Sequence, residues 1–138
     1  MKIYLASSFR YIPQVKDLQE YLITEASDRS QHEIVCEWWH TDYKLELKAQ
    51  SVNEWFANPV IKVIYQRSLQ AIRECDLLIL VTPEVTKFNG ANVEVGIALA
   101  LGKPVIAFGK LEKSGMYEPL VRCSTLDELK LALREFEI

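Results

Sequence analysis

The sequence has no basic excess, no long apolar run and few cysteines, and each absence excludes a class of protein. Sixteen Lys and Arg residues stand against nineteen Asp and Glu, so the net charge is −3 and nucleic acid is disfavoured as a partner. The longest apolar runs, Leu77–Val81 and Ile97–Leu101, are far too short to span a bilayer. The chain opens with a short strand pattern rather than a secretory signal, so we expect a cytoplasmic protein with no membrane partner.

Metal-binding clusters of cysteine and histidine are also missing. Cys36, Cys75 and Cys123 cannot all pair with one another, and none lies in a Cys-x-x-Cys spacing. The two histidines, His32 and His40, complete no set of zinc ligands, so we expect no metal site. Each cysteine lies in or beside an apolar run, which predicts buried and reduced thiols.

The length and the hydrophobic pattern predict one domain over residues 1–138, with alternating strands and helices. With 138 residues, 49% of them hydrophobic, the chain can bury one core. The predicted strands are Lys2–Ala6, Glu33–Trp39, Leu77–Val81, Pro104–Phe108 and Leu120–Cys123. The predicted helices are Arg10–Ala26, Thr41–Cys75 with a break at Asn58-Pro59, Val93–Leu101 and a last one that ends near Phe136 and is capped by Thr125 or Ser124. This alternation is typical of an α/β fold: a flavodoxin- or Rossmann-like three-layer sandwich with a five-stranded parallel sheet, commonly in the order 2-1-3-4-5.

The predicted fold indicates where a ligand would bind, because open parallel sheets bind ligands beyond the carboxyl ends of their strands. Three segments meet at that edge: Ser7–Arg10 after the first strand, Trp39-His40 after the second, and Thr82–Val93 after the third. Asp76 begins the third strand, so we expect it in a turn at the opposite edge.

The common phosphate-binding motifs are absent from these segments. The chain has no Gly-x-Gly-x-x-Gly and no Gly-Lys-Ser/Thr loop, which excludes dinucleotide and P-loop sites. The loop after the first strand offers the hydroxyls of Ser7 and Ser8, helix-start amides and the Arg10 cation. These groups suit a phosphate or a sugar hydroxyl, and they equally suit a helix cap followed by a surface arginine.

Glu94 is a more specific sign of function than the loop after the first strand. It lies in Asn89-Gly90-Ala91-Asn92-Val93-Glu94-Val95-Gly96, in the expected first turn of a helix with no other charge before Lys103. Such a carboxylate can simply complement the helix dipole. Its isolation in an apolar helix that faces the predicted crevice favours an ionised carboxylate that acts as a nucleophile.

These residues resemble the nucleoside 2-deoxyribosyltransferase superfamily, which includes deoxynucleotide N-hydrolases. The resemblance covers nearly the whole chain and is strongest in MKIYLASSFR (1–10), CDLLILV (75–81) and NGANVEVGIALALGKPVIAFG (89–109). The family pattern Gly-x-x-x-Glu-x-Gly-x-Ala-x-x-x-Gly-Lys is met here by Gly90, Glu94, Gly96, Ala98, Gly102 and Lys103.

The resemblance implies an enzyme that cleaves or exchanges the N-glycosidic bond of a 2′-deoxynucleoside or its 5′-monophosphate. Glu94 would be the nucleophile and would form a covalent deoxyribosyl-enzyme, with no metal or organic cofactor. Ser7, Ser8 and Arg10 match the family's 5′-group site, and the arginine favours a phosphate there. The other expected substrate contacts are Trp39, which also suits a core position, and His40, Asn89, Gly90, Asn92 and Tyr117.

Two positions depart from the family pattern. The family has an aspartate about two helical turns before the third strand, and here that position is Ser68, which we keep among the substrate contacts. A second aspartate, which assists the leaving base, has no counterpart near Phe88 and Asn89, so Glu84 is the substitute candidate for the proton donor. Two alternatives stay open: a non-catalytic nucleotide-binding module of the same fold, and an interaction domain without a ligand.

Two predicted helices have apolar arcs wider than one sheet requires. Val93–Leu101 is apolar on nearly every side, and Val60–Ile72 over more than one face, which predicts a homodimer or a higher homo-oligomer. In the family, the loop after the fourth strand completes the neighbouring subunit's pocket. Here that loop is Gly109–Glu118, with Ser114, Tyr117 and Glu118 as candidates. The alternative to association is that the segment Thr41–Asn58 covers the apolar arcs of both helices within one chain.

Overall fold

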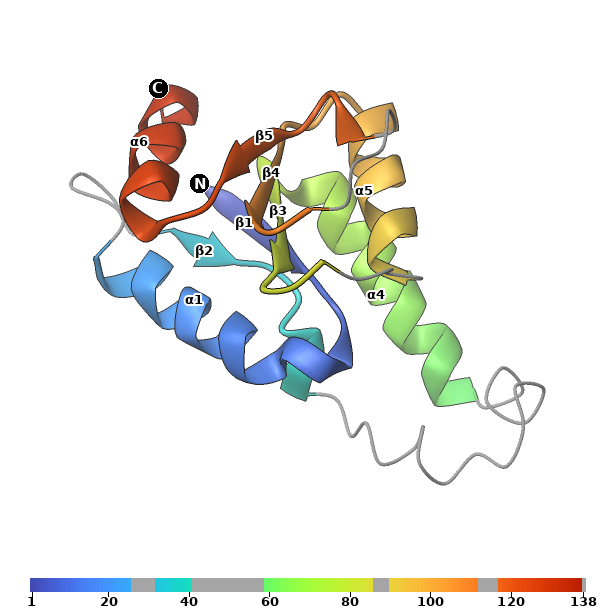
Figure 1. The fold of residues 1–138 in the computed structure, drawn as a ribbon. Coiled ribbons are helices and arrows are strands. Elements are labelled where there is room, and N and C mark those ends of the chain that lie inside the picture. Colours follow the sequence, from blue (N-terminus) through green and yellow to red (C-terminus); the bar gives the residue numbers. More distant parts are fainter. Residues whose placement is uncertain (26–31, 41–58, 86–89, 112–116, 138) are drawn as a thin grey trace.

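Five parallel strands form one sheet in the order β2-β1-β3-β4-β5 in the computed structural model, as predicted (Figure 1). The structure describes residues 1–25, 32–40, 59–85, 90–111 and 117–137. Its strands are β1 (Lys2–Ala6), β2 (Glu33–Ile34), β3 (Leu77–Thr82), β4 (Val105–Gly109) and β5 (Val121–Cys123). Its helices are α1 (Ile12–Thr24), α4 (Pro59–Glu74), α5 (Gly90–Ala100) and α6 (Leu126–Phe136), with the 3-10 turns η1 (Phe9–Tyr11) and η2 (Trp38–His40). Helices α1 and α6 lie on one face of the sheet and α4 and α5 on the other (Figure 1).

Hydrophobic patterning accounts for the central strand, and a proline and a capping threonine account for the starts of two helices. All of Leu77–Thr82 is buried, because a central parallel strand is covered by helices on both faces. Helix α4 begins at Pro59, where the break was expected, since proline is tolerated in a first turn. Thr125 caps α6: its hydroxyl accepts a hydrogen bond of 3.2 Å from the Glu128 amide.

Two predicted boundaries are wrong. The strand predicted over Glu33–Trp39 ends at Ile34, because Cys36 adopts a left-handed backbone angle of φ 57° and the following residues turn into η2. The helix predicted from Val93 begins at Gly90. The helical segment predicted before Pro59 lies outside the described residues.

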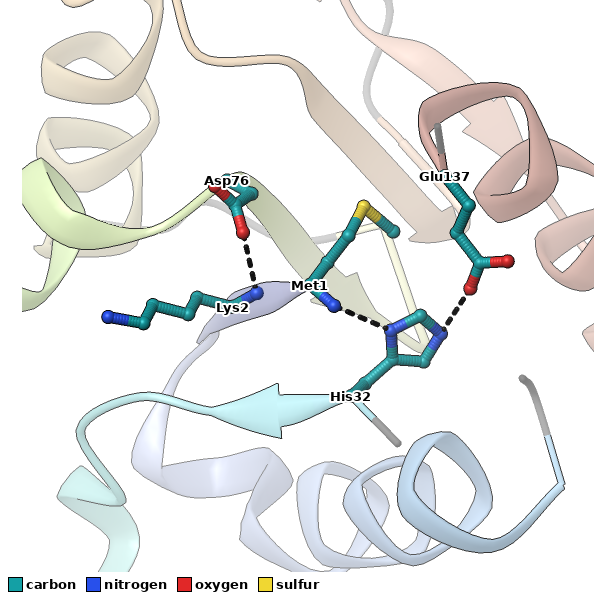
Figure 2. Close-up of polar contacts among 5 residues, drawn as sticks. All are labelled: Met1, Lys2, His32, Asp76 and Glu137. Carbon is teal, nitrogen blue, oxygen red and sulfur yellow. Dashed lines mark hydrogen bonds and ion pairs between the residues drawn. The ribbon is translucent and has the colours of Figure 1, made fainter. Parts of the chain in front are cut away.

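Polar contacts at the amino-terminal edge of the sheet join its first strands to the last helix (Figure 2). Asp76 lies there, as predicted, and its Oδ2 accepts a hydrogen bond of 2.8 Å from the Lys2 amide. The buried His32 ring lies 3.0 Å from Glu137 Oε1 through Nε2 and 3.5 Å from the Met1 amino group through Nδ1. Burial, followed by the charge of that amino group, lowers the pKa of His32. These contacts fasten α6 to the sheet, at the edge opposite the carboxyl ends of the strands.

Two further observations concern the cysteines and the length of the helices. All three cysteines are free thiols; Cys75 and Cys123 are buried as predicted, whereas Cys36 is only half-buried. Among the helices of the described ranges, none has both the length and the apolar character to cross a membrane.

Candidate active site

Glu94 and Tyr4 form the centre of the candidate active site. Tyr4 comes from β1 and is 1% exposed, and its hydroxyl donates a hydrogen bond to Glu94 Oε2 on α5. Nothing in the sequence marked this tyrosine as functional. The contact therefore joins the middle of the first strand to the one carboxylate of α5.

Burial governs the ionisation of both groups. It raises the pKa of Glu94 to about 7, and the hydrogen bond from Tyr4 opposes that rise. The pKa of Tyr4 lies far above its ordinary value, first because the ring is buried and second because the Glu94 charge is close. Tyr4 therefore keeps its proton and serves as a neutral donor to a carboxylate that is half ionised near neutral pH.

This environment corrects the prediction for Glu94. A place in the first helical turn was expected to keep the carboxylate ionised through the helix dipole. Because α5 begins at Gly90, its first turn contains no acidic residue, and the Glu94 side chain is half-buried rather than solvent-facing. Burial, not the helix start, determines how readily Glu94 ionises.

Ser68 and Cys36 approach Tyr4 from two other elements. Ser68 lies on α4 and is 9% exposed, and its hydroxyl lowers the pKa of Tyr4 in opposition to the larger effect of burial. Cys36 Sγ lies 3.8 Å from Ser68 Oγ. Cys36 also lines a groove of about 510 Å³ between the β2 segment and α4. The family resemblance pointed to Ser68 alone; the positive φ of Cys36 left no signal in the sequence.

The loop after β1 uses its two serine hydroxyls within the protein. Ser7 Oγ donates a hydrogen bond of 2.7 Å to the Val81 carbonyl, which fastens the end of β1 to β3. Ser8 Oγ accepts a hydrogen bond of 3.2 Å from the Arg10 amide and so caps η1. The side chain of Arg10 is exposed, so it is the group of this loop best able to bind an anion.

Three aromatic rings gather where β1 and the β2 segment end. Phe9 and Trp38 make an edge-to-face pair, and so do Trp38 and Trp39, each with centroids 5.5 Å apart. Trp38 Nε1 donates a hydrogen bond of 2.6 Å to the Leu5 carbonyl, and both tryptophans are buried. Trp39 therefore packs in the core, and Phe9 is the exposed ring of the three. His40 ends η2, and its side chain lies outside the described part.

The predicted acid Glu84 lies beyond β3. It is exposed, and its Oε2 accepts a hydrogen bond of 3.4 Å from the Tyr11 hydroxyl. The structure gives no contact between Glu84 and the Glu94–Tyr4 pair. Within the described ranges, no three His, Cys, Asp or Glu side chains come together as a metal site.

The remaining predicted contacts surround the start of α5. Asn92 Oδ1 accepts a hydrogen bond of 2.8 Å from the Tyr117 hydroxyl, so Tyr117 binds within its own chain. Gly90 is the first residue of α5, and the space around its α carbon is open. Asn89 and Ser114 lie outside the described residues.

The chain belongs to the nucleoside 2-deoxyribosyltransferase family, whose model matches residues 3–120. It is similar in structure to the CMP N-glycosidase BcmB of Clostridium botulinum, with a TM-score of 0.58 and 19% identity over 97% of this chain and 99% of that one. It is also similar to a 2-deoxyribosyltransferase from Bacillus psychrosaccharolyticus, with a TM-score of 0.65 and 21% identity over 94% and 90% of the two chains. A search of curated proteins gives no significant match. Membership of the family supports chemistry at the N-glycosidic bond of nucleosides, and the two neighbours support the fold.

Proposed function

We propose that this protein cleaves or exchanges the N-glycosidic bond of a 2′-deoxynucleoside or its 5′-monophosphate, with Glu94 as the nucleophile. The observation that carries the proposal is the buried Tyr4 hydroxyl, which holds the Glu94 carboxylate in a half-buried position on α5. A lone carboxylate in an apolar helix destabilises the fold when ionised, so its retention needs a function. Membership of the family supports the same chemistry.

The proposed reaction has two displacement steps. In the first, a Glu94 oxygen attacks the anomeric carbon while the carbon–nitrogen bond breaks, and the base leaves with the electron pair and takes up a proton. In the second, water or a nitrogen of an acceptor base attacks the same carbon and loses a proton, and Glu94 departs as a carboxylate. Each step inverts the anomeric carbon and passes through an oxocarbenium-like transition state, so the product retains the configuration.

Tyr4 acts in this scheme through Glu94. Its hydrogen bond to Oε2 orients the carboxylate and stabilises the ionised form, which is the reactive one. Glu84 is the proposed proton donor for the departing base, because it is a carboxyl group at the carboxyl end of β3. The other proposed substrate contacts are those expected from the sequence without the core residue Trp39: Ser7, Ser8, Arg10, His40, Ser68, Asn89, Gly90, Asn92 and Tyr117.

An assay with nucleosides and nucleotides tests the proposal. The protein is incubated with the common deoxynucleosides and their 5′-monophosphates, with and without a second free base, and the products are separated by chromatography. Base released in water alone identifies a hydrolase, and a new nucleoside formed from the second base identifies a transferase. Ligand binding without either product would support the non-catalytic nucleotide-binding module, which the replacement of a family acid by Ser68 favours.

Arg10 is expected to determine the preference for a 5′-phosphate. Arg10→Ala should weaken binding of a deoxynucleoside 5′-monophosphate by about 1.5–3 kcal/mol, the range of a hydrogen bond to a charged group. Binding of the plain deoxynucleoside should stay nearly unchanged. Calorimetric titration with both ligands measures the difference, and Arg122→Ala, an exposed arginine on β5, is the matched control. Equal losses for both ligands would contradict a role of Arg10 in phosphate binding.

We also propose that two copies associate through α4 and α5. Exposed apolar side chains stand on both helices: Val63, Tyr65 and Leu69 on α4, and Val93 on α5. Helix α5 has no polar outer face that would keep it in water. Light scattering at micromolar concentration should give a mass near twice 15.9 kDa. A mass near 15.9 kDa would contradict the dimer.

A further inference from the structure

Tyr11 joins the loops that follow β1 and β3. It ends η1, directly after β1, and is 3% exposed. Its hydroxyl donates a hydrogen bond of 3.4 Å to Oε2 of Glu84, the proposed proton donor in the loop after β3. Strand β1 lies between β2 and β3, so the order of the strands reverses at the pair of β1 and β3. Open parallel sheets bind ligands beyond the carboxyl ends of such a pair, so this contact lies where the substrate is expected.

We propose that Tyr11 is a positioning residue, whose hydroxyl holds the Glu84 carboxyl group in place for proton transfer to the departing base. The inference rests on the proposed function, with Glu84 as its proton donor. Tyr11 acts through Glu84 and is not itself a catalytic residue.

A second contact holds the main chain of Glu84. Thr82 ends β3 and is 1% exposed, and its hydroxyl donates a hydrogen bond of 3.0 Å to the Glu84 carbonyl. The same hydroxyl also contacts the Lys110 carbonyl, just after β4. An exposed glutamate side chain samples several rotamers even where its backbone is fixed. The contact with the buried Tyr11 limits that sampling for Glu84.

A tyrosine hydroxyl suits a carboxyl group that changes its protonation during the reaction. In the first step Glu84 gives its proton to a ring atom of the base as the carbon–nitrogen bond breaks. In the second step the Glu84 carboxylate takes a proton from the attacking water or acceptor base. The Tyr11 hydroxyl can donate to the carboxylate and accept from the protonated carboxyl group, so the contact can persist in both states. A lysine or an arginine could only donate and would favour the ionised form throughout.

The length of the contact indicates where its effect should be measured. At 3.4 Å it is longer than an ideal hydrogen bond between two oxygens. Hydrogen bonds at active sites are often long before a substrate is bound and shorten in the complex. Loss of the Tyr11 hydroxyl should therefore be seen in the rate of the step in which Glu84 acts.

Substrates that differ in their need for a proton donor test the proposal. Two pairs cover both classes of base: 2′-deoxyguanosine with 7-methyl-2′-deoxyguanosine, and 2′-deoxyuridine with 5-fluoro-2′-deoxyuridine. The second substrate of each pair needs less help, because 7-methylguanine leaves as a neutral molecule and 5-fluorouracil leaves as a more stable anion. All four are supplied as nucleosides and as 5′-monophosphates. Chromatography measures the released base, and the spontaneous rate is subtracted.

Tyr11→Phe keeps the buried ring and removes only the hydroxyl. It should lower kcat for the first substrate of each pair roughly tenfold at a nearly unchanged KM, and for the second substrate by much less. Glu84→Gln should show the same selectivity with a larger loss, on the order of a hundredfold. In the double variant the rates should equal those of Glu84→Gln, because Tyr11 acts through Glu84. Tyr21→Phe, which removes a hydroxyl bonded to the Leu126 carbonyl, is the matched control and should change no rate.

Three results would overturn the proposal: an unchanged kcat in Tyr11→Phe, equal losses for both substrates of a pair, and losses that multiply in the double variant. A raised KM at an unchanged kcat would also overturn it, because Tyr11 would then support the Arg10 loop instead. Failure of the proposed function gives a different result. The parent would then release no base from any of the four substrates, and both proposals would be wrong.

Discussion

Replacement of Glu94 by glutamine should lower kcat/KM for glycosidic cleavage at least about a thousandfold. A neutral amide cannot attack the anomeric carbon to form the ester that the proposed first step requires. The amide oxygen can still accept the hydrogen bond from Tyr4, so the geometry of the site should be kept. Release of free base, followed by chromatography, measures the loss.

Further experiments show whether the loss of activity comes from the chemical step or from misfolding. Circular dichroism and a thermal melt should show that Glu94→Gln is folded. Mass spectrometry of the parent, quenched during turnover, should find a deoxyribosyl group on the peptide that contains Glu94. Glu84→Gln should slow the departure of the base without removing that covalent species. Turnover by Glu94→Gln at the rate of the parent would show that another group is the nucleophile.

The order of the sheet could be predicted because 2-1-3-4-5 is a common order for five parallel strands, and the sequence marks the third strand as a central one. Leu77–Val81 is apolar on both faces, a pattern typical of a strand between two helical layers. The end of the second strand could not. Glu33–Trp39 has the β-branched and aromatic residues of a long strand, and strand propensity depends on context. The left-handed backbone at Cys36 instead ends the strand early, and beyond it Trp38 Nε1 donates a hydrogen bond to the Leu5 carbonyl.

The candidate site likewise contains one residue that could be predicted from the sequence and one that could not. Glu94 could be found from the sequence because it is a lone charge in an apolar helix and completes a family pattern. Tyr4 could not, because it reads as one more apolar residue of a buried strand. Its role depends on a contact between residues far apart in the sequence, which the pairing of β1 with β3 and the packing of α5 determine. Hydrophobic periodicity predicts which side chains are buried and leaves open which polar groups meet inside.

Stability should respond to Glu94→Gln in the opposite direction from activity. The folded protein raises the pKa of Glu94 from its ordinary value of 4.5 to about 7, so it holds this proton more tightly than the unfolded chain does. The Glu94 carboxyl group therefore opposes folding least below pH 4.5. Its unfavourable contribution to stability grows as the pH rises to about 7 and then stays constant.

Above that window, at about pH 8, Glu94→Gln should increase the free energy of unfolding by an amount on the order of 1–3 kcal/mol, because the amide carries no charge to bury. At about pH 4 both side chains are neutral, and the gain should disappear. Urea denaturation of parent and variant at both pH values measures the two differences. Glu84→Gln is the matched control: Glu84 is an exposed glutamate, so its replacement should leave the free energy of unfolding nearly unchanged. A gain of equal size at both pH values would mean that the glutamine improves packing. A gain confined to high pH would show that the ionised, half-buried Glu94 lowers the stability of the fold. Such a loss of stability is expected of a nucleophile that must be ionised to react.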